Sequence, residues 1–224
     1  MNSVTLHIDD KLITADEGKT IMEAALENDI YIPHLCYHPE LKPKSVCRLC
    51  MVEVNGNSPV LSCQTRVEAG MKVSTRSPAV DRLVLPIVEL VIVDHHTSCS
   101  GCPCNKKCKL QKIMAHFHID RKRLQRLRPP AAAKPTEALN SFLNYDPNRC
   151  VRCGICLQTC EDLSGRGYLY FVDRGYNTKI AFYGDESMCA TCLKCVSRCP
   201  VGALLPGQQY IQARLAADAF PSDF

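Results

Sequence analysis

The sequence has little of what several common protein classes require. It contains no Trp, and aromatic residues make up only 6% of its 224 residues. The longest apolar run, Leu83 to Val93, is interrupted by Pro86 and Glu89 and is shorter than the roughly 20 residues of a membrane span. The first residues, MNSVTLHIDD, lack the apolar centre of a secretory signal. These absences predict a cytoplasmic protein with no direct membrane insertion.

The charge and the missing nucleotide motifs exclude further classes. The net charge of +4 is too small to indicate nucleic-acid binding. The basic run RKRLQRLR at 121–128 lacks interleaved aromatic residues, so it is interpreted as a solvated helix end or a docking face for an acidic partner. No G-x-G-x-x-G or P-loop is present, and Gly165 and Gly167 are interpreted as loop residues. The chain therefore shows no site for NAD, flavin or a final substrate, and no catalytic residue is predicted.

Cysteine, in contrast, is abundant, with sixteen residues. In a reducing compartment, sets of cysteines are more often metal ligands than disulfides. Core packing does not require thiols to lie near one another in the sequence, so their clustering indicates ligand groups. The four groups are Cys36, Cys47, Cys50, Cys63; Cys99, Cys102, Cys104, Cys108; Cys150, Cys153, Cys156, Cys160; and Cys189, Cys192, Cys195, Cys199.

The third and fourth groups have the most specific spacing. CVRCGICLQTC and CATCLKCVSRCP each read C-x2-C-x2-C-x3-C, the pattern in which the fourth Cys of each run binds the other [4Fe–4S] cluster. Zinc fits poorly because it commonly takes two separated C-x2-C pairs. Glu161 replaces the usual Pro after the first run, but the ligands are intact. The predicted ligand sets are Cys150, Cys153, Cys156 and Cys199 for one cluster, and Cys189, Cys192, Cys195 and Cys160 for the other.

The first group reads C-x10-C-x2-C-x12-C, with a longer first gap than plant-type ferredoxins have. Together with IPHLCYHPEL and CRLCMVEV, it resembles the [2Fe–2S] module at the start of the large iron–sulfur subunit of respiratory complex I. That family often has a Gly shortly before the second Cys, where this chain has Ser45 and Val46. With four cysteines present, His34 and His38 are predicted to be polar loop residues. The resemblance implies the ligand set Cys36, Cys47, Cys50 and Cys63.

The second group, with the preceding histidines, reads H-x3-C-x2-C-x5-C. It resembles the [4Fe–4S] module with one His and three Cys ligands that follows in the same complex I subunit. His96 is an alternative to His95, and Cys104 is an alternative to Cys102, so both choices stay open. A His ligand makes the cluster less negative and favours its reduction. The resemblance implies the ligand set His95, Cys99, Cys102 and Cys108.

Four modules in this order, over residues 1–205, resemble three groups of proteins. They are the front part of the complex I subunit, the small diaphorase subunit of NAD-reducing soluble hydrogenases, and the front part of iron-only hydrogenases. The two complete ligand sets near the C-terminus look more like the hydrogenase and formate dehydrogenase relatives. The resemblance implies one [2Fe–2S] and three [4Fe–4S] clusters.

The implied role is single-electron relay in a hetero-oligomer. One partner would be a flavin- and NAD(P)H-binding subunit, and the other a terminal redox subunit such as a hydrogenase, a formate dehydrogenase or another reductase. Two other classes stay open: a free polyferredoxin, and a structural or nucleic-acid protein that carries clusters. Free ferredoxins are usually small and acidic, which favours the fixed subunit.

The predicted fold class is α+β, built from several iron–sulfur modules. A β-grasp [2Fe–2S] ferredoxin-like domain is expected at 1–77, and a helical module with the His/Cys3 cluster at 78–128. A linker at 129–140 precedes a 2[4Fe–4S] ferredoxin-like domain with a C-terminal tail at 141–224.

Local patterns predict the elements of these modules. Thr20 with Glu23 forms a capping box for a helix, and Asn55–Gly56 indicates a hairpin. Pro86 is expected to kink or divide a helix that runs from 77 to 93. The other expected elements are strands at 4–8, 11–14 and 71–74, a helix at 109–127, and a hairpin from 168–173 and 179–183.

Overall fold

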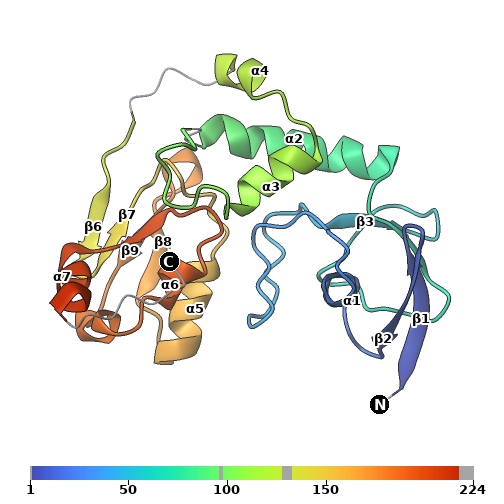
Figure 1. Cartoon of the computed structure of the whole chain (residues 1–224), viewed down its shortest axis with the longest axis horizontal. Helices are drawn as coiled ribbons and strands as arrows, with labels where there is room; N and C mark the ends of the chain where they lie inside the picture. The colour runs from blue at the N-terminus through green and yellow to red at the C-terminus, as the bar shows by residue number, and fades with distance from the viewer. Residues whose placement is uncertain (1, 96–97, 128–132, 217–224) are drawn as a thin grey trace. The chain divides into compact units, whose positions relative to one another are not determined.

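The computed structural model describes residues 2–95, 98–127 and 133–216. The chain is a mixed α/β protein that divides into two compact units (Figure 1). The N-terminal unit comprises Met1–Val91 and Lys112–Arg121, and the C-terminal unit comprises Ile92–Gln111 and Lys122–Phe224.

A five-stranded sheet of order β2-β1-β5-β3-β4 forms the frame of the N-terminal unit. Strand β1 (Ser3–Ile8) pairs antiparallel with β2 (Lys11–Asp16) and parallel with β5 (Lys72–Ser74). Strand β3 (Met51–Val54) pairs antiparallel with both β5 and β4 (Val60–Leu61). The predicted strands and the Asn55–Gly56 hairpin are therefore confirmed.

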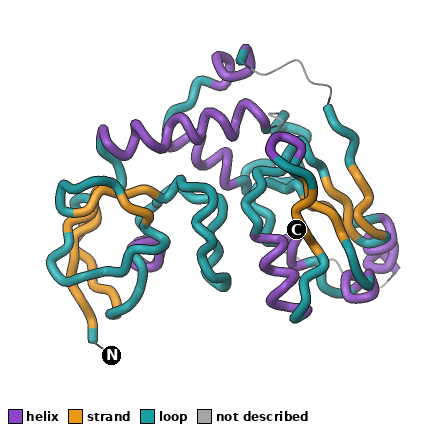
Figure 2. The backbone as a smooth tube through the Cα atoms, turned by 180° about the vertical axis from the view of Figure 1, so that it is seen from behind, coloured by secondary structure: helices purple, strands orange, loops and turns teal. Residues whose placement is uncertain are grey.

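Helix α1 (Ile21–Glu27) packs its apolar face into the core of this sheet. The predicted capping box is present, because the backbone N–H of Thr20 donates to Glu23 Oε2 and the N–H of Glu23 donates to Thr20 Oγ1. Alternate residues of β1, Leu6 and Ile8, are fully buried against it. The resulting core supports a long loop, residues 28–50, which has no regular secondary structure (Figure 2).

Helix α2 (Pro78–Asp94) is continuous, so of the two outcomes predicted at Pro86, a kink or a division, the division does not occur. Pro86 and Arg82 are both exposed, so water can solvate the Arg82 carbonyl that loses its hydrogen bond. Only one stripe of the helix is fully buried, and Leu90 is 72% exposed.

The single helix predicted over 109–127 is two helices, α3 (Lys109–His116) and α4 (Arg121–Arg126). His118 adopts a left-handed conformation with φ 51°. The N–H of Ile119 donates to Met114 O and the N–H of His118 donates to Ala115 O. This pattern is a Schellman motif, which terminates α3 without the usual Gly.

Two small sheets organise the C-terminal unit. The first has the order β10-β7-β6 and combines β6 (Glu137–Asn140), β7 (Leu143–Tyr145) and β10 (Leu204–Pro206). The second is the predicted hairpin, formed by β8 (Leu169–Val172) and β9 (Lys179–Phe182). Strand β6 falls within the expected linker at 129–140, whose first four residues lie outside the described part of the chain.

Short helices connect these strands. They are α5 (Ile155–Ser164), the 3-10 turns η1 (Gly175–Asn177) and η2 (Glu186–Ala190), α6 (Lys194–Ser197) and α7 (Gln208–Ala216). Among the described residues, no helix is long and apolar enough to cross a bilayer.

Candidate metal centres

The structure brings the first cysteine group together in the N-terminal unit. The Sγ atoms of Cys36 and Cys47 lie 3.3 Å apart, and those of Cys50 and Cys63 also lie 3.3 Å apart. The negative charge of Cys47 acts to raise the pKa values of both Cys50 and Cys63, which shows that the two pairs lie in one site. Cys36, Cys50 and Cys63 are buried, and Cys47 is half-buried.

Each pair in this site shares a proton between two thiols. The hydrogen bond from Cys36 lowers the pKa of Cys47 to about 6, and the hydrogen bond from Cys50 lowers that of Cys63 to about 6. The same two contacts, together with burial, raise the pKa values of Cys36 and Cys50. At neutral pH each pair therefore offers a thiolate, which is the form that binds metal.

The loop before Cys47 adopts an unusual conformation. Ser45 has φ 56°, in the left-handed region that favours glycine. Its hydroxyl lies 3.4 Å from Cys63 Sγ and accepts a hydrogen bond from Gln64 Nε2 at 2.7 Å. Ser45 therefore takes a glycine-like conformation at the place where the sequence lacks the expected Gly.

The two histidines of this loop bond to the backbone nearby. His34 Nδ1 lies 2.8 Å from the carbonyl oxygen of Ile32, and His38 Nδ1 accepts a hydrogen bond from the N–H of Glu40. These contacts are consistent with the predicted role of polar loop residues.

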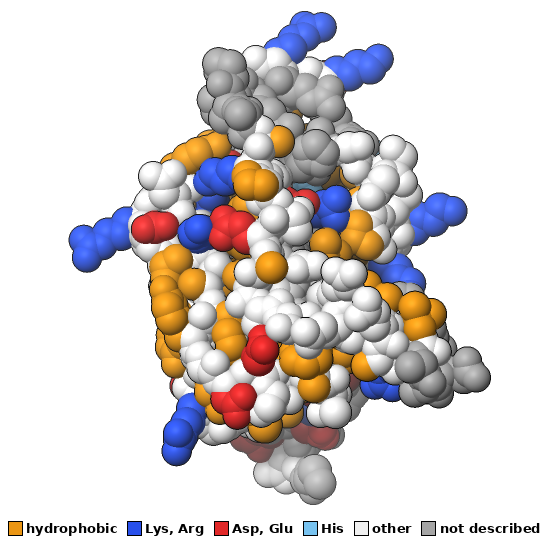
Figure 3. Space-filling view, turned by 90° about the vertical axis from the view of Figure 1, so that its left-hand side faces the viewer, with side chains coloured by type: hydrophobic (Ala, Val, Ile, Leu, Met, Phe, Trp, Pro, Cys, Tyr) orange, Lys and Arg blue, Asp and Glu red, His pale blue; other side chains and the backbone are white. Residues whose placement is uncertain are grey.

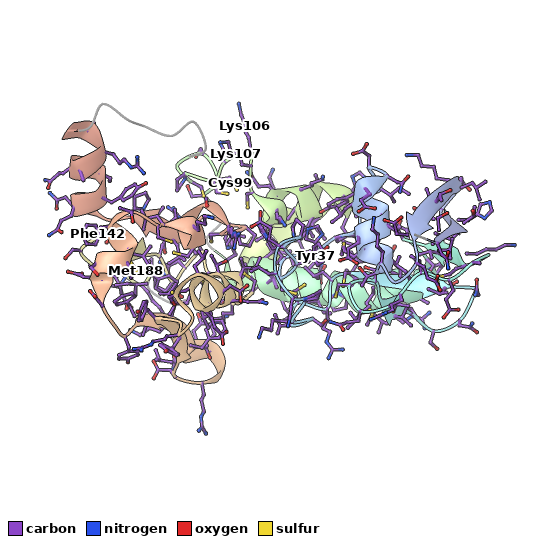
Figure 4. The ribbon with its side chains drawn as sticks, turned by 90° about the horizontal axis from the view of Figure 1, so that it is seen from below. Tyr37, Cys99, Lys106, Lys107, Phe142 and Met188 are labelled. Carbon is purple, nitrogen blue, oxygen red and sulfur yellow. The ribbon has the colours of Figure 1, made fainter. Side chains whose placement is uncertain are left out.

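The second group lies on the loop between α2 and α3, where Figure 4 shows Cys99, Lys106 and Lys107 close together. His95 is 9% exposed, whereas His96 lies outside the described residues. The N–H of Cys102 donates to the carbonyl of Cys99, which forms a tight turn.

Cys104, the alternative ligand of this loop, is half-buried and contacts Cys108. A hydrogen bond between the two thiols lowers the pKa of Cys108 to about 6, and the backbone N–H groups of Leu110 and Gln111 in α3 act in the same direction. The negative charges of Cys102 and Cys199 also raise the pKa of Cys104. Cys104 thus lies between the second cysteine group and the end of the fourth.

The third centre combines three cysteines of one run with the last cysteine of the other. Cys150, Cys153, Cys156 and Cys199 line one cavity. The N–H of Arg152 donates to Cys150 Sγ at 3.4 Å, and the N–H of Ala203 donates to Cys199 Sγ at 3.3 Å. Burial raises the pKa values of Cys150 and Cys156.

The fourth centre has the reciprocal composition. Cys160, from α5, lines one apolar cavity together with Cys189, Cys192 and Cys195. The N–H of Tyr168 donates to Cys160 Sγ at 3.3 Å, and Asn140 Nδ2 donates to Cys189 Sγ at 3.5 Å. Figure 4 labels Met188, which also lines this cavity.

A common turn explains how each run wraps around its centre. The residue after the second cysteine is left-handed in both runs, Gly154 with φ 77° and Leu193 with φ 40°. A leucine in this conformation is strained, and such strain is typical of functional sites. The two runs therefore share a left-handed turn at the same place, just before the helix that carries the third cysteine of each run.

Arg152 supports the third centre and was not among the predicted site residues. Its guanidinium forms an ion pair with Asp94 at 2.8 Å and donates to the carbonyls of Thr178 and Tyr176, both at 3.1 Å. The only sequence signal was its place inside a cysteine run. Arg152 therefore fixes the backbone that presents Cys150 and Cys153.

The chemistry of these centres fits iron–sulfur clusters. No disulfide joins any of the sixteen cysteines, all of which lie in the described residues. In the same part of the chain, no three His, Cys, Asp or Glu side chains converge as ligands of a single metal ion. Four thiolates in an apolar cavity need positive charge to offset desolvation. Iron supplies that charge, and the backbone N–H donors to sulfur are of the kind that tune cluster potentials.

Three family models match separate parts of the chain. Residues 1–78 match a 2Fe-2S iron-sulfur cluster binding domain, and residues 149–203 match a 4Fe-4S dicluster domain. Residues 86–123 match the NADH-ubiquinone oxidoreductase-G iron-sulfur binding region.

Similar curated proteins are larger oxidoreductase subunits. NADPH-Fe(3+) oxidoreductase subunit alpha of Geobacter sulfurreducens is 32% identical over 90% of this chain, which spans 24% of that protein. NADP-reducing hydrogenase subunit HndD of Solidesulfovibrio fructosivorans is 32% identical over 99% of this chain, which spans 39% of it. A subunit of the NADH-quinone oxidoreductase of Rhizobium meliloti is 29% identical over 94% of this chain, which spans 25% of it.

A solved structure matches nearly the whole chain. A chain in the crystal structure of an NAD+-reducing [NiFe]-hydrogenase in the H2-reduced state superposes with a TM-score of 0.76 at 30% identity. The match covers 92% of this chain and 88% of that one. The likeness in fold therefore extends over nearly the whole chain.

Proposed function

The chain belongs to the family of iron–sulfur proteins that includes the matching NADH-quinone oxidoreductase subunit and the matching chain of the NAD+-reducing [NiFe]-hydrogenase, and we propose that it relays single electrons within a larger oxidoreductase. The observation that carries the proposal is the crossed composition of the two C-terminal centres. In a two-cluster ferredoxin the fourth cysteine of each run binds the cluster of the other run, an arrangement that eight unrelated thiols would not show.

The proposed cofactors are one [2Fe–2S] cluster and three [4Fe–4S] clusters. They would be held in a β-grasp domain, a helical His/Cys3 module and a bacterial-type ferredoxin domain. The crossed cavities, the close sulfur pairs and the three family matches support this assignment. The proposed ligand sets are Cys36, Cys47, Cys50, Cys63; His95, Cys99, Cys102, Cys108; Cys150, Cys153, Cys156, Cys199; and Cys189, Cys192, Cys195, Cys160.

The paired sulfurs of the first centre suggest how its ligands divide between two irons. Two thiolates on one tetrahedral metal lie about 3.8 Å apart, given metal–sulfur bonds of about 2.3 Å. The Cys36–Cys47 and Cys50–Cys63 separations are close to this edge length. We therefore assign one iron to each pair.

When bound, the clusters supply one-electron redox chemistry, and the protein sets how easily it occurs. The N–H groups of Arg152, Tyr168 and Ala203 donate to ligand sulfurs and stabilise the added negative charge of a reduced state. The predominantly apolar walls of the C-terminal cavities limit the contact of the centres with water.

The proposed partners are a flavin- and NAD(P)H-binding subunit and a terminal redox subunit. Relatives bear the names of NAD(P)H-linked oxidoreductases and hydrogenases, and this chain spans about a quarter of the first curated relatives. The partners would supply and remove electrons, while this chain divides a hydride equivalent into single-electron steps.

The first test is anaerobic analysis of iron and acid-labile sulfide, with EPR after dithionite reduction. The proposal expects about 14 iron atoms per chain and signals of both cluster types. About four zinc ions without an EPR signal would show a structural metal protein.

Ligand variants test the crossed assignment. Cys156→Ala and Cys199→Ala should perturb the same EPR signal, whereas Cys160→Ala and Cys195→Ala should perturb another. If Cys156→Ala and Cys160→Ala instead removed the same signal, the crossing would be wrong.

A further inference from the structure

The C-terminal unit contains a cavity of about 410 Å³ beside the proposed third centre. It lies between the loop that carries Pro103 to Lys107 and the segment from β10 to α7. Its volume is in the range of small-molecule sites, and its lining is predominantly apolar. Leu204, Leu205, Pro206 and Ile211 provide most of the apolar wall.

Two cations line the cavity from opposite segments of the chain. Lys107 comes from the cysteine loop and Arg214 from α7, and no Asp or Glu is among the described residues that line the cavity. Arg214 Nε donates to the hydroxyl of Tyr210 at 3.2 Å, which fixes the guanidinium beside the wall. Within the described part of the chain, neither cation forms an ion pair. The cavity is therefore suited to an anion with an apolar body.

The cavity also reaches a proposed cluster ligand. Cys199 lines both this cavity and the third centre. Gly202, which lines the same wall, leaves room for Cys104 because a Cβ on Gly202 would lie 2.7 Å from Cys104 Cβ. A molecule in the cavity would thus lie beside a residue whose thiol is a proposed cluster ligand. Figure 3 shows one face of the molecule, on which apolar and basic side chains lie side by side.

We propose that this cavity binds a small anionic ring compound as an electron acceptor, so that electrons can leave the relay there without a protein partner. The inference rests on the proposed electron-transfer function. A quinone bound in the cavity would take up two electrons, one from each of two reduced clusters, and two protons from water. The quinone becomes a hydroquinone, and two clusters return to the oxidised state.

Anthraquinone-2,6-disulfonate, a planar dianion, is the probe. The full chain with its clusters is titrated by calorimetry in the oxidised state, and the dithionite-reduced chain, freed of reductant, is mixed with the quinone. The expected result is saturable binding and a reoxidation rate that saturates with quinone concentration. Hexaammineruthenium(III), a trication that is a stronger oxidant than low-potential clusters, should reoxidise the chain without saturation.

Lys107→Ala and Arg214→Ala should each weaken binding about tenfold, because each removes a charge-assisted contact. Arg174→Ala removes an exposed cation of the same unit away from the cavity and should leave binding unchanged. Iron content and EPR of every variant report on the clusters, so a loss of the quinone site is distinguishable from a failure of the relay.

Absence of calorimetric binding would overturn the proposal, as would equal weakening by Arg174→Ala. A hexaglutamate peptide that binds as tightly as the quinone and displaces it would also overturn it, because the cavity would then be a docking site for an acidic protein segment.

Discussion

At the scale of single residues, the second cysteine group leaves a choice that spacing alone does not make. Cys104 lies two residues from Cys102, and its thiol contacts Cys108. Its Cβ packs against Gly202 in another loop. The close approach to Gly202 suits a residue that joins two loops, and the C-x2-C spacing favours Cys102 as the ligand.

Substitution of the two cysteines should therefore give different results. Cys102→Ala should lose one cluster, a decrease of about four iron atoms per chain, because a ligand is removed. Cys104→Ala should retain about 14 iron atoms. Iron and acid-labile sulfide analysis of both variants decides the matter, and the reverse pattern would make Cys104 the ligand.

Gly202 is the second such residue, because its lack of a side chain leaves space for Cys104. It has φ +65°, and an added Cβ would lie 2.7 Å from Cys104 Cβ. Gly165 has a similar φ of +70° but no atom within 4 Å of an added Cβ. A substitution at Gly165 therefore meets only the strain of a left-handed φ, whereas a substitution at Gly202 also meets steric overlap with Cys104.

Gly165→Ala should lower the free energy of unfolding by about 1 kcal/mol, through the left-handed φ alone. Gly202→Ala should cost about 1–3 kcal/mol more, because the two loops must move apart. Denaturant unfolding of both variants measures the difference. Equal losses would show that Cys104 does not pack against Gly202.

At the scale of elements, α3 is closed by a Schellman motif just beyond His116. The His116 ring stacks edge-on against Tyr31 at 5.1 Å and Phe117 at 4.9 Å. Among the described residues, its buried Nε2 has no hydrogen-bond partner. Burial lowers the pKa of His116, and the nearby cation Arg76 adds to this effect.

The N-terminal unit should therefore lose stability in mild acid. A His with a lowered folded-state pKa takes up its proton more readily when unfolded, so stability falls as pH decreases below about 6.5. Asp81 and Asp9 oppose the shift, and His118 adds to it. His116→Phe should reduce the pH dependence of unfolding between about pH 7.5 and 5.5. An unchanged slope would show that His116 does not titrate on unfolding.

At the scale of the whole molecule, the two units differ in what holds them together. The N-terminal unit has a contiguous core formed by the sheet and α1. In the C-terminal unit, two small sheets and short helices surround two cavities lined by cysteines. Where metal-ligand sites take the place of a hydrophobic core, metal binding contributes directly to the free energy of folding.

Removal of the clusters should consequently affect the units unequally. Anaerobic treatment with an oxidant and a chelator should abolish protection from amide hydrogen exchange in α5 and the β8–β9 hairpin. Strands β1 and β2 should keep theirs. Hydrogen exchange followed by mass spectrometry measures both in one sample, and equal loss in the two units would contradict this account.

Much of the local structure could be predicted because its causes are local. The capping box of α1 and the Asn55–Gly56 turn depend on residues a few positions apart. The break between α3 and α4 was missed because His118, not Gly, adopts the left-handed conformation. Asp120, a residue type favoured at N-caps, was the available signal for the start of α4.

The sequence by itself determined the spacing of the sixteen cysteines and hence the chemistry that the chain is suited to, because ligand type and spacing are properties of short segments. Only the tertiary structure decided that Arg152 braces Cys150, that Gly202 accommodates Cys104, and that two cations line one cavity. These contacts join residues far apart in the chain, and their formation depends on packing rather than on local sequence.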